Sequence, residues 1–223
     1  MPTRYAQHFM TDQKVIGEIC DYAKVDGDDV VLEIGAGTGN LTSELVKRAK
    51  LVYGIERDQE LTCILNNKLL KKKFNQKIKI IHGDALKVPF PRFNKAVSNI
   101  PYSISRKITL KLLKHKFDLS VLVYQKEFAE KLIAAPKTRE YRAISVIVQC
   151  CAEVEILKEL SPAVFSPRPR VKSAITRITP KSRITDEFIE FVYSLFSHRN
   201  KKIKGVGKRP FELNPGEFLK LYH

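Results

Sequence analysis

The sequence predicts an α/β fold in which a mainly parallel sheet carries helices on both faces. Apolar runs of strand length alternate with amphipathic helical segments over most of the chain, and that alternation is typical of βαβ units. The first run, VVLEI at residues 30–34, leads into the glycine-rich turn GAGTG, which in such folds joins a strand to the next helix. The 223 residues have room for one main domain. We place it at residues 1–180, with a small helical extension over residues 181–223.

Each predicted element rests on the spacing of apolar side chains. Helical spacing predicts helices over residues 12–23, 41–49, 58–73, 108–116 and 126–135. Short apolar runs predict strands over residues 30–34, 51–56, 78–86, 95–100 and 119–125.

The pattern changes in the last third of the chain. Residues 141–160 have the pattern of a helix passing into a strand, and prolines at 162, 167, 169 and 180 enclose one more strand after a long ordered loop. After Pro180 we expect one helix and a short basic tail, and its segment SHRNKKIKGVGKR, residues 197–209, should bury little apolar surface.

The charge of the chain indicates a polyanionic partner. It carries 40 Lys and Arg against 24 Asp and Glu, a formal charge of +16, and nucleic acid is the first partner that this balance indicates. An acidic membrane surface is the alternative. The sequence has neither an apolar run of about 18 residues nor an evident basic amphipathic helix, so we expect no membrane association.

The cysteines and histidines indicate neither a disulfide framework nor a metal site. Cys20, Cys63, Cys150 and Cys151 lack Cys-x-x-Cys spacing, so we expect small buried hydrophobic side chains. The histidines are scattered without ligand spacing. The N-terminal sequence MPTRYAQHFMTDQ has no apolar signal core. We therefore expect a reduced, cytoplasmic location and no metal.

The glycine-rich turn and two acidic residues predict a nucleotide-like cofactor. Gly35 and Gly37 allow a tight turn and a close ligand approach at the start of a helix. Glu56 ends the second predicted strand, where a carboxylate can accept bonds from both ribose hydroxyls. Asp84 ends the third, where it can hold an adenine amino group. A nicotinamide cofactor stays an alternative, although the G-x-G-x-G spacing and Glu33 just before the turn speak against it.

The fourth predicted strand ends in NIPY, residues 99–102, and these residue types suit methyl transfer to an amino nitrogen. An adenine amino nitrogen is a poor nucleophile because its lone pair is delocalised into the ring. If the Asn99 side-chain oxygen and the Ile100 carbonyl accept its hydrogens, that lone pair turns toward the methyl donor. Pro101 can hold the chain in the required shape because its φ is fixed, and Tyr102 can stack on the base. Positioning then supplies most of the rate.

These motifs resemble class I S-adenosylmethionine-dependent methyltransferases, and NIPY is similar to the motif of members that modify amino nitrogens. Further blocks resemble the ribosomal RNA adenine dimethyltransferases. They are QHFMTD at residues 7–12, YQKEF to VIVQ at 124–149, FSPRPRVKSAITRI at 165–178 and HRNKK at 198–202. The resemblance covers nearly the whole chain.

The resemblance implies an activity and its partners. S-adenosylmethionine would donate the methyl groups, with S-adenosylhomocysteine as the product. Two methyl groups would go to each of two adjacent adenosines near the 3′ end of small-subunit ribosomal RNA, as a step in ribosome biogenesis. The partner would be this RNA or the pre-assembled small subunit, and we expect a monomer.

The resemblance also implies roles for individual residues. Catalysis would fall to Asn99 and Tyr102, which hold the target base while Phe165 stacks on its other face. The implied cofactor-binding residues are His8, Met10, Gly35, Gly37, Glu56, Asp84 and Asn99. His8 stands where many relatives have Asn, and Met10 where most have Leu. The extension after Pro180 is shorter than the helical domain usual in the family.

Two basic groups are our candidates for RNA phosphate contacts. One adjoins NIPY and contains Arg106 and Lys107, and the other, in the tail, contains Arg199, Lys201 and Lys202. Three other functions stay open. They are a large-subunit rRNA adenine methyltransferase of the antibiotic-resistance type, a ribosome-assembly or RNA-binding factor with dispensable catalysis, and a nicotinamide-dependent dehydrogenase.

Overall fold

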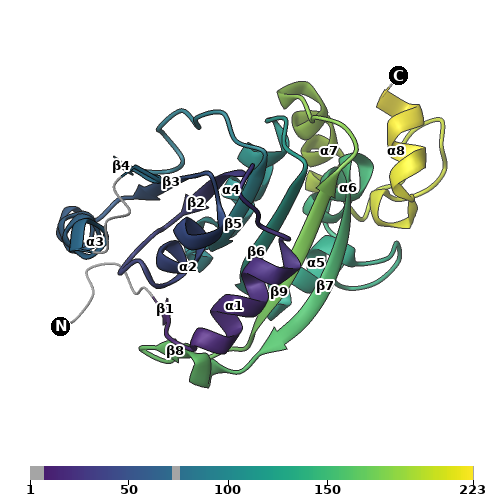
Figure 1. The fold of residues 1–223 in the computed structure, drawn as a ribbon. Helices are drawn as coiled ribbons and strands as arrows, with labels where there is room; N and C mark the ends of the chain where they lie inside the picture. Colours follow the sequence, from purple (N-terminus) through teal and green to yellow (C-terminus); the bar gives the residue numbers. More distant parts are fainter. Residues whose placement is uncertain (1–7, 72–75, 223) are drawn as a thin grey trace.

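The computed structural model describes residues 8–71 and 76–222 (Figure 1), and it confirms the predicted α/β class. One seven-stranded sheet has the order β4-β3-β2-β5-β6-β9-β7. Its strands are β2 (Val30–Ile34), β3 (Leu51–Glu56), β4 (Ile78–His82), β5 (Lys95–Asn99), β6 (Leu119–Gln125), β7 (Ala152–Leu160) and β9 (Ser173–Pro180).

The five strands β2, β3, β4, β5 and β6 run parallel to one another. Their carboxyl ends therefore meet at one edge of the sheet, and we call this the carboxyl edge. The long strand β9 lies antiparallel to both β6 and β7. The sheet is therefore mixed, with its antiparallel part on the β6 side.

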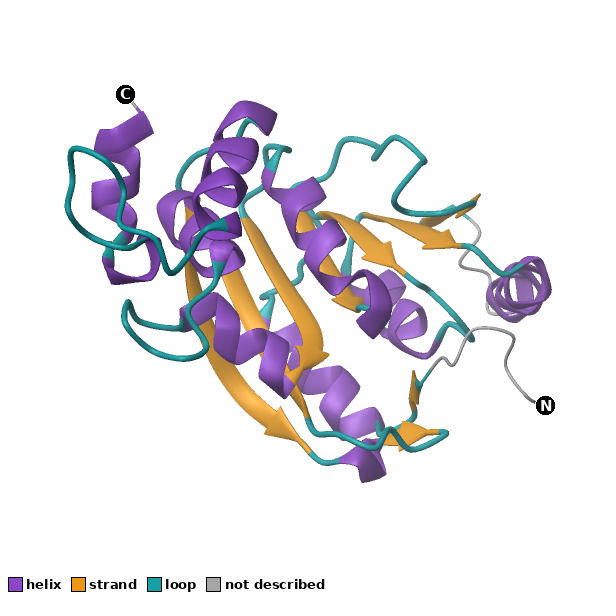
Figure 2. Cartoon of the chain, turned by 180° about the vertical axis from the view of Figure 1, so that it is seen from behind, coloured by secondary structure: helices purple, strands orange, loops and turns teal. Residues whose placement is uncertain are grey.

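Helices cover both faces of the sheet (Figures 1 and 2). The helices α1 (Gln13–Tyr22), α2 (Asn40–Arg48) and α3 (Gln59–Lys71) cover one face, and α4 (Ser105–Leu113), α5 (Lys126–Ile133) and α6 (Ala143–Cys151) cover the other. The central strand β2 sends Val31 into one core cluster and Leu32 into the other. This two-sided burial explains why its sequence is a continuous apolar run.

A second, two-stranded sheet was not expected from the sequence. β1 (Phe9–Met10) pairs antiparallel with β8 (Phe165–Ser166), so that Met10 lies opposite Phe165. Thr11 N also donates to Val164 O at 2.9 Å. These contacts bring residues 8–11 beside the loop after β7, although more than 150 residues separate them in the sequence.

The C-terminal part differs from the prediction of one helix and a solvated tail. α7 (Asp186–Ser197) is followed by a second helix, α8 (Pro215–Tyr222), and Phe218 of α8 is 0% exposed. The second helix was not predicted, whereas residues 197–209 between the two helices contain no buried residue, as expected for the basic tail. Phe188, Val192, Leu213 and Phe218 belong to the same core cluster as Leu32 of the central strand. The domain boundary near residue 180 stays a prediction.

Candidate active site

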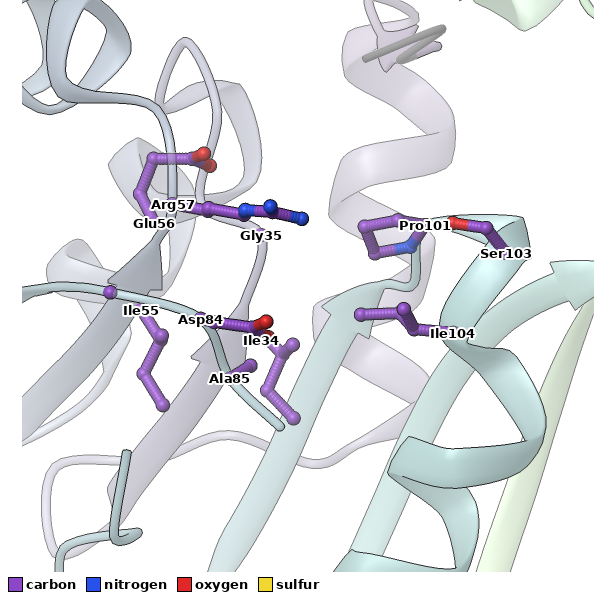
Figure 3. Close-up of a pocket in the computed structure, with 11 residues that line it drawn as sticks. Ile34, Gly35, Ile55, Glu56, Arg57, Asp84, Ala85, Pro101, Ser103 and Ile104 are labelled. Atoms are coloured by element: carbon purple, nitrogen blue, oxygen red, sulfur yellow. The ribbon is translucent and has the colours of Figure 1, made fainter. Parts of the chain in front are cut away.

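A cavity opens at the carboxyl edge of the sheet (Figure 3). Its walls come from the ends of β2, β3 and β5 and from the loop after β4, and it is lined by Ile34, Gly35, Ile55, Glu56, Arg57, Gly83, Asp84, Ala85, Pro101, Ser103 and Ile104. Figure 3 shows Glu56, Arg57 and Asp84 on one side and Pro101, Ser103 and Ile104 on the other. The structure thus brings together three motifs that are separate in the sequence.

Glu56 is held rigidly at the end of β3. Its side chain is 1% exposed, and its two oxygens accept bonds from the backbone N–H groups of Gly37 and Asp58, each at 2.8 Å. A carboxylate oxygen has more than one acceptor site, so both oxygens keep capacity for further donors. Glu56 can therefore receive ribose hydroxyls without moving.

The glycine-rich turn after β2 requires glycine at two positions. Gly35 has φ +75°, and a Cβ there would lie 3.3 Å from the Pro101 ring. Gly37 has φ +55°, and a Cβ there would lie 2.9 Å from the Phe9 ring. Both glycines are thus required by backbone conformation and by the close approach of their neighbours. Without side chains at these two positions, Pro101 and Phe9 can pack closely against the turn.

Asp84 lies where the chain turns after β4. Its Oδ1 accepts from Leu86 N at 2.9 Å, and the rest of the carboxylate faces the cavity. Lys111 of α4 fixes the same loop by donating to the Ala85 and Val88 carbonyls at 2.8 and 2.6 Å. Burial lowers the pKa of Lys111. We therefore expect Lys111 to position the loop rather than to contact RNA.

Asn99 has a buried acceptor without a donor. Its Nδ2 donates to the His8 carbonyl at 2.9 Å, which fixes the orientation of the amide. Its Oδ1 is buried and has no hydrogen-bond partner among the residues that the structure describes. Such an oxygen costs stability unless a ligand supplies a donor. The amide is thus arranged to accept a bond from a bound molecule.

Tyr102 is held at both ends. Its backbone belongs to the short helix η1 (Tyr102–Ile104), and its hydroxyl lies 2.6 Å from Ser173 Oγ, at the start of β9. Burial raises the pKa of Tyr102. The His8 ring lies 5.7 Å from the Tyr102 ring, and His8 Nδ1 donates to the Pro167 carbonyl at 2.7 Å. His8 and Met10 therefore close the site from the N-terminal side, whereas Gln7 lies outside the described residues.

Phe165 is not brought to this position. Its side chain is 2% exposed and packs in the core cluster that also contains Met10. In this conformation the ring offers no face to a base. The assignment of Phe165 to base stacking therefore stays a prediction that requires the loop after β7 to rearrange.

The candidate phosphate contacts lie in two groups. Arg106 and Lys107 are exposed on α4, and the Arg106 guanidinium lies 6.0 Å from the Tyr193 ring of α7. Lys201 and Lys202 are exposed beyond α7, whereas Arg199 is half-buried over the Phe211 ring at 5.2 Å. The helix α7 thus lies beside the first group and leads directly into the second. The sequence did not indicate this arrangement.

Two polar residues at the site were not predicted as site residues from the sequence. Glu33, 2% exposed, lines a small second cavity on the other side of Gly35, together with Met10 and Asn99. Ser173 lies in the FSPRPRVKSAITRI block, but its partner Tyr102 is 71 residues away, so spacing could not reveal the bond. No group of His, Cys, Asp and Glu in the described ranges could hold a metal ion.

The mixed sheet and this site define a class I methyltransferase. The chain belongs to the ribosomal RNA adenine dimethylase family, whose model matches residues 1–212. It is 46% identical over 197 residues to the probable ribosomal RNA small subunit methyltransferase A of Methanothermobacter thermautotrophicus, with 88% of this chain and 71% of the relative covered. The protein of that name from Pyrococcus abyssi is 44% identical over 200 residues, with coverages of 90% and 73%.

Solved structures agree with this assignment. A dimethyladenosine transferase from Plasmodium falciparum matches with a TM-score of 0.86 and 28% identity, covering 96% of both chains. The 23S rRNA methyltransferase ErmE matches with a TM-score of 0.73 and 26% identity, covering 96% of this chain and 98% of its own. A dimethyladenosine transferase and a 23S rRNA methyltransferase therefore share this architecture.

Proposed function

We propose that this protein transfers methyl groups from S-adenosylmethionine to the amino nitrogens of adenosines in small-subunit ribosomal RNA. The family and the small-subunit relatives at 40 to 46% identity support this substrate. The chemistry rests mainly on one observation: Oδ1 of Asn99, beside Pro101, is buried and has no hydrogen-bond donor within the described part of the chain. Two adjacent adenosines near the 3′ end, each dimethylated, are the finer form of the proposal.

The carboxyl edge suits an adenosine-containing cofactor. Glu56 would accept bonds from the ribose hydroxyls and Asp84 from the adenine amino group, while Gly35 lines the same cavity and the Gly37 N–H holds Glu56 in place. When bound, S-adenosylmethionine supplies an electrophilic methyl group on a positively charged sulfur. The reactive end would lie near Asn99, because Gly35 stands between the acids and NIPY. His8 and Met10 would close that end.

The residues of NIPY would prepare the target nitrogen. Asn99 Oδ1 and the Ile100 carbonyl would accept its hydrogens, which turns the lone pair away from the base ring. Tyr102, held by Ser173, would present its ring to the base. No strong general base is required, because the methyl donor is reactive and positioning lowers most of the barrier.

The RNA would be held by the basic side chains around the site. Arg106 and Lys107 lie on the helix that follows NIPY, and Lys201 and Lys202 lie beyond α7. We also keep a monomeric state and a cytoplasmic location as proposals. Within the described residues, no helix is both long and apolar enough to cross a membrane.

The decisive experiment offers the purified protein both ribosomal subunits. Small and large subunits that lack adenosine dimethylation are incubated with labelled S-adenosylmethionine, and the modified bases are mapped. We expect dimethyladenosine in the small subunit alone. Label in the large subunit would favour the ErmE-type activity, and tight subunit binding without methyl transfer would favour an assembly factor.

A further inference from the structure

A second hollow lies at the edge of the sheet opposite to the proposed catalytic site. It forms where the chain enters β5 and where α4 leads into β6, and Asp118 N donates to Asn94 O at 2.8 Å between these two segments. Its volume is about 550 Å³, within the range of about 300 to 1,000 Å³ that is typical of ligand sites. Because the parallel strands start here, we call it the amino-edge hollow. Its lining includes Phe90, Arg92, Phe93, His115, Lys116 and Phe117.

Four rings form an aromatic surface in the amino-edge hollow. Phe93 and Phe117 are each 5% exposed, and their rings stack with centroids 5.8 Å apart. Phe90 and His115 are half-buried, and their ring centroids lie 5.1 Å apart. Both of these rings line the hollow, so part of each ring is accessible to a ligand.

Lys111 of α4 holds the two half-buried rings in place. Its ammonium lies 4.1 Å from the centroid of the Phe90 ring. Its backbone carbonyl lies 2.9 Å from His115 Nδ1, and the nitrogen must donate this bond because a carbonyl oxygen only accepts. Rings that are already held in this way lose little side-chain freedom when a flat ligand stacks on them.

The charges at the rim of the hollow favour an anion. Arg92 and Lys116 are exposed, and neither takes part in an ion pair within the part of the chain that the structure describes. Among the described residues, Asp118 is the one acidic side chain of the lining, and Asn94 Nδ2 donates to it at 3.5 Å. Two cations against one carboxylate leave a positive charge at the rim.

We infer that the amino-edge hollow binds an unstacked nucleotide of single-stranded RNA. Aromatic rings can stack on the flat face of any base, and Arg and Lys bind the phosphates beside it. An acidic peptide would use the two cations but not the flat rings, and an apolar partner would use the rings but not the cations. The inference concerns RNA binding alone and goes beyond the proposed methyl transfer.

The position of the hollow predicts how it affects the enzyme. The strand β5 runs from Lys95, beside the hollow, to Asn99 at the opposite edge, so the nucleotide in the hollow is not the one that is methylated. Its contacts are the same before and during methyl transfer. Changes in the hollow should therefore raise the KM for the small subunit and leave kcat unchanged.

The direct test is photo-crosslinking of the wild-type protein, without methyl donor, to a short single-stranded RNA that contains 4-thiouridine. Mass spectrometry then locates the crosslinked residues. We expect crosslinks within residues 90–94 and 115–118. Crosslinks confined to the carboxyl edge and to the part of the chain after Pro180 would overturn the inference.

Variants separate the stacking from the charge. Phe90→Leu keeps the apolar bulk but removes the flat ring, so RNA affinity should fall about fivefold or more, whereas an abasic strand should bind the variant and the wild-type protein equally. Arg92→Ala and Lys116→Ala should each reduce the log-log salt slope by about 0.7. Phe191→Leu, at a half-buried ring of α7, and Lys220→Ala, at an exposed position of α8, are the matched controls and should change neither quantity.

The remaining outcomes separate this inference from the proposed function. If Phe90→Leu weakens the binding of small subunits but not of free RNA, a ribosomal protein occupies the hollow and the inference is wrong. Absence of methyl transfer to either subunit would contradict the proposed function and leave the crosslinks unchanged. The wild-type crosslinks decide the question even if Phe90→Leu does not fold.

Discussion

The carboxyl edge of the sheet and the C-terminal cap, which we define as residues 184–222, bury their side chains in opposite ways. At the edge, Glu33 and Asn99 bury oxygens that have no partner within the described chain. In the cap, the buried side chains are mostly apolar and paired, such as Phe196 and Phe218, whose rings stack with centroids 5.9 Å apart. The described part of the cap has one comparable unpartnered atom, Arg199 Nε.

The difference teaches where stability and function lie in this molecule. A buried oxygen without a donor lowers the free energy of unfolding. The edge is therefore less stable than it would be if donors, such as those of a ligand, paired with these oxygens. The cap is tied to the main core by Tyr141, which donates to the Leu213 carbonyl at 2.9 Å, and by Lys137 N, which donates to the Phe211 carbonyl at 2.8 Å. Changes at the edge should therefore affect activity, and changes in the cap should affect stability.

The largest effect should follow Asn99→Ala. Methyl transfer should fall by about a hundredfold or more, because the target nitrogen loses a positioning acceptor. Stability should change little, since the variant loses the bond to His8 but also removes a buried acceptor without a donor. Single-turnover methylation and thermal melting measure the two effects. Asn66→Ala, at an exposed position of α3, is the control. Near-normal turnover of Asn99→Ala would exclude Asn99 from the catalytic site.

The opposite pattern is expected for Phe218→Ala. Removing a fully buried aromatic side chain should lower the free energy of unfolding by about 3 to 5 kcal/mol, whereas cofactor affinity at low temperature should be retained. Denaturant unfolding and calorimetry measure these quantities. Leu221→Ala is the control on the same helix, because Leu221 is 38% exposed. Equal stability of the two variants would mean that the cap does not belong to the cooperative core.

A smaller effect on the methyl transfer rate is expected at Ser173, which lies at the start of β9 and holds the Tyr102 hydroxyl. Ser173→Ala should lower the methyl transfer rate by up to about tenfold, because the bond that orients Tyr102 contributes about 0.5 to 1.5 kcal/mol. Adding Tyr102→Phe to Ser173→Ala should lower the rate no further. Ser120→Ala removes another buried hydroxyl of the same sheet, on β6, and should leave the rate unchanged. Additive losses in the double variant would show that the two hydroxyls act separately.

The smallest effect is expected at Lys107. It lies on α4, next to Arg106, whose guanidinium lies beside Tyr193 of the cap. Lys107→Ala should weaken small-subunit binding a few-fold and reduce the log-log salt slope by about 0.7 to 0.9, as expected for one phosphate contact. Lys50→Ala, an exposed change at the opposite edge of the sheet, is the control. An unchanged slope for Lys107→Ala would place the RNA elsewhere.

The residues at the carboxyl edge were predictable because they stand at the ends of recognisable strands. Parallel strands bring their carboxyl ends to one edge, so Gly35, Glu56, Asp84 and Asn99 could be assigned to one site from their places after successive apolar runs. Local patterns also located most helices. By contrast, the helix α8 was not predicted, because one or two turns of apolar spacing do not reveal what the side chains pack against.

By itself, the sequence determined the class of fold, the glycine turn, the acids and the NIPY motif, since each depends on residues that are close in the chain. Only the tertiary structure decided that Ser173 holds Tyr102, that Phe165 is buried against Met10, and that Phe218 completes the core. It also decided that Glu33 lines a small cavity beside the glycine turn. These features depend on contacts between segments far apart in the chain, and on atoms left without a partner, and neither leaves a periodic signal in the sequence.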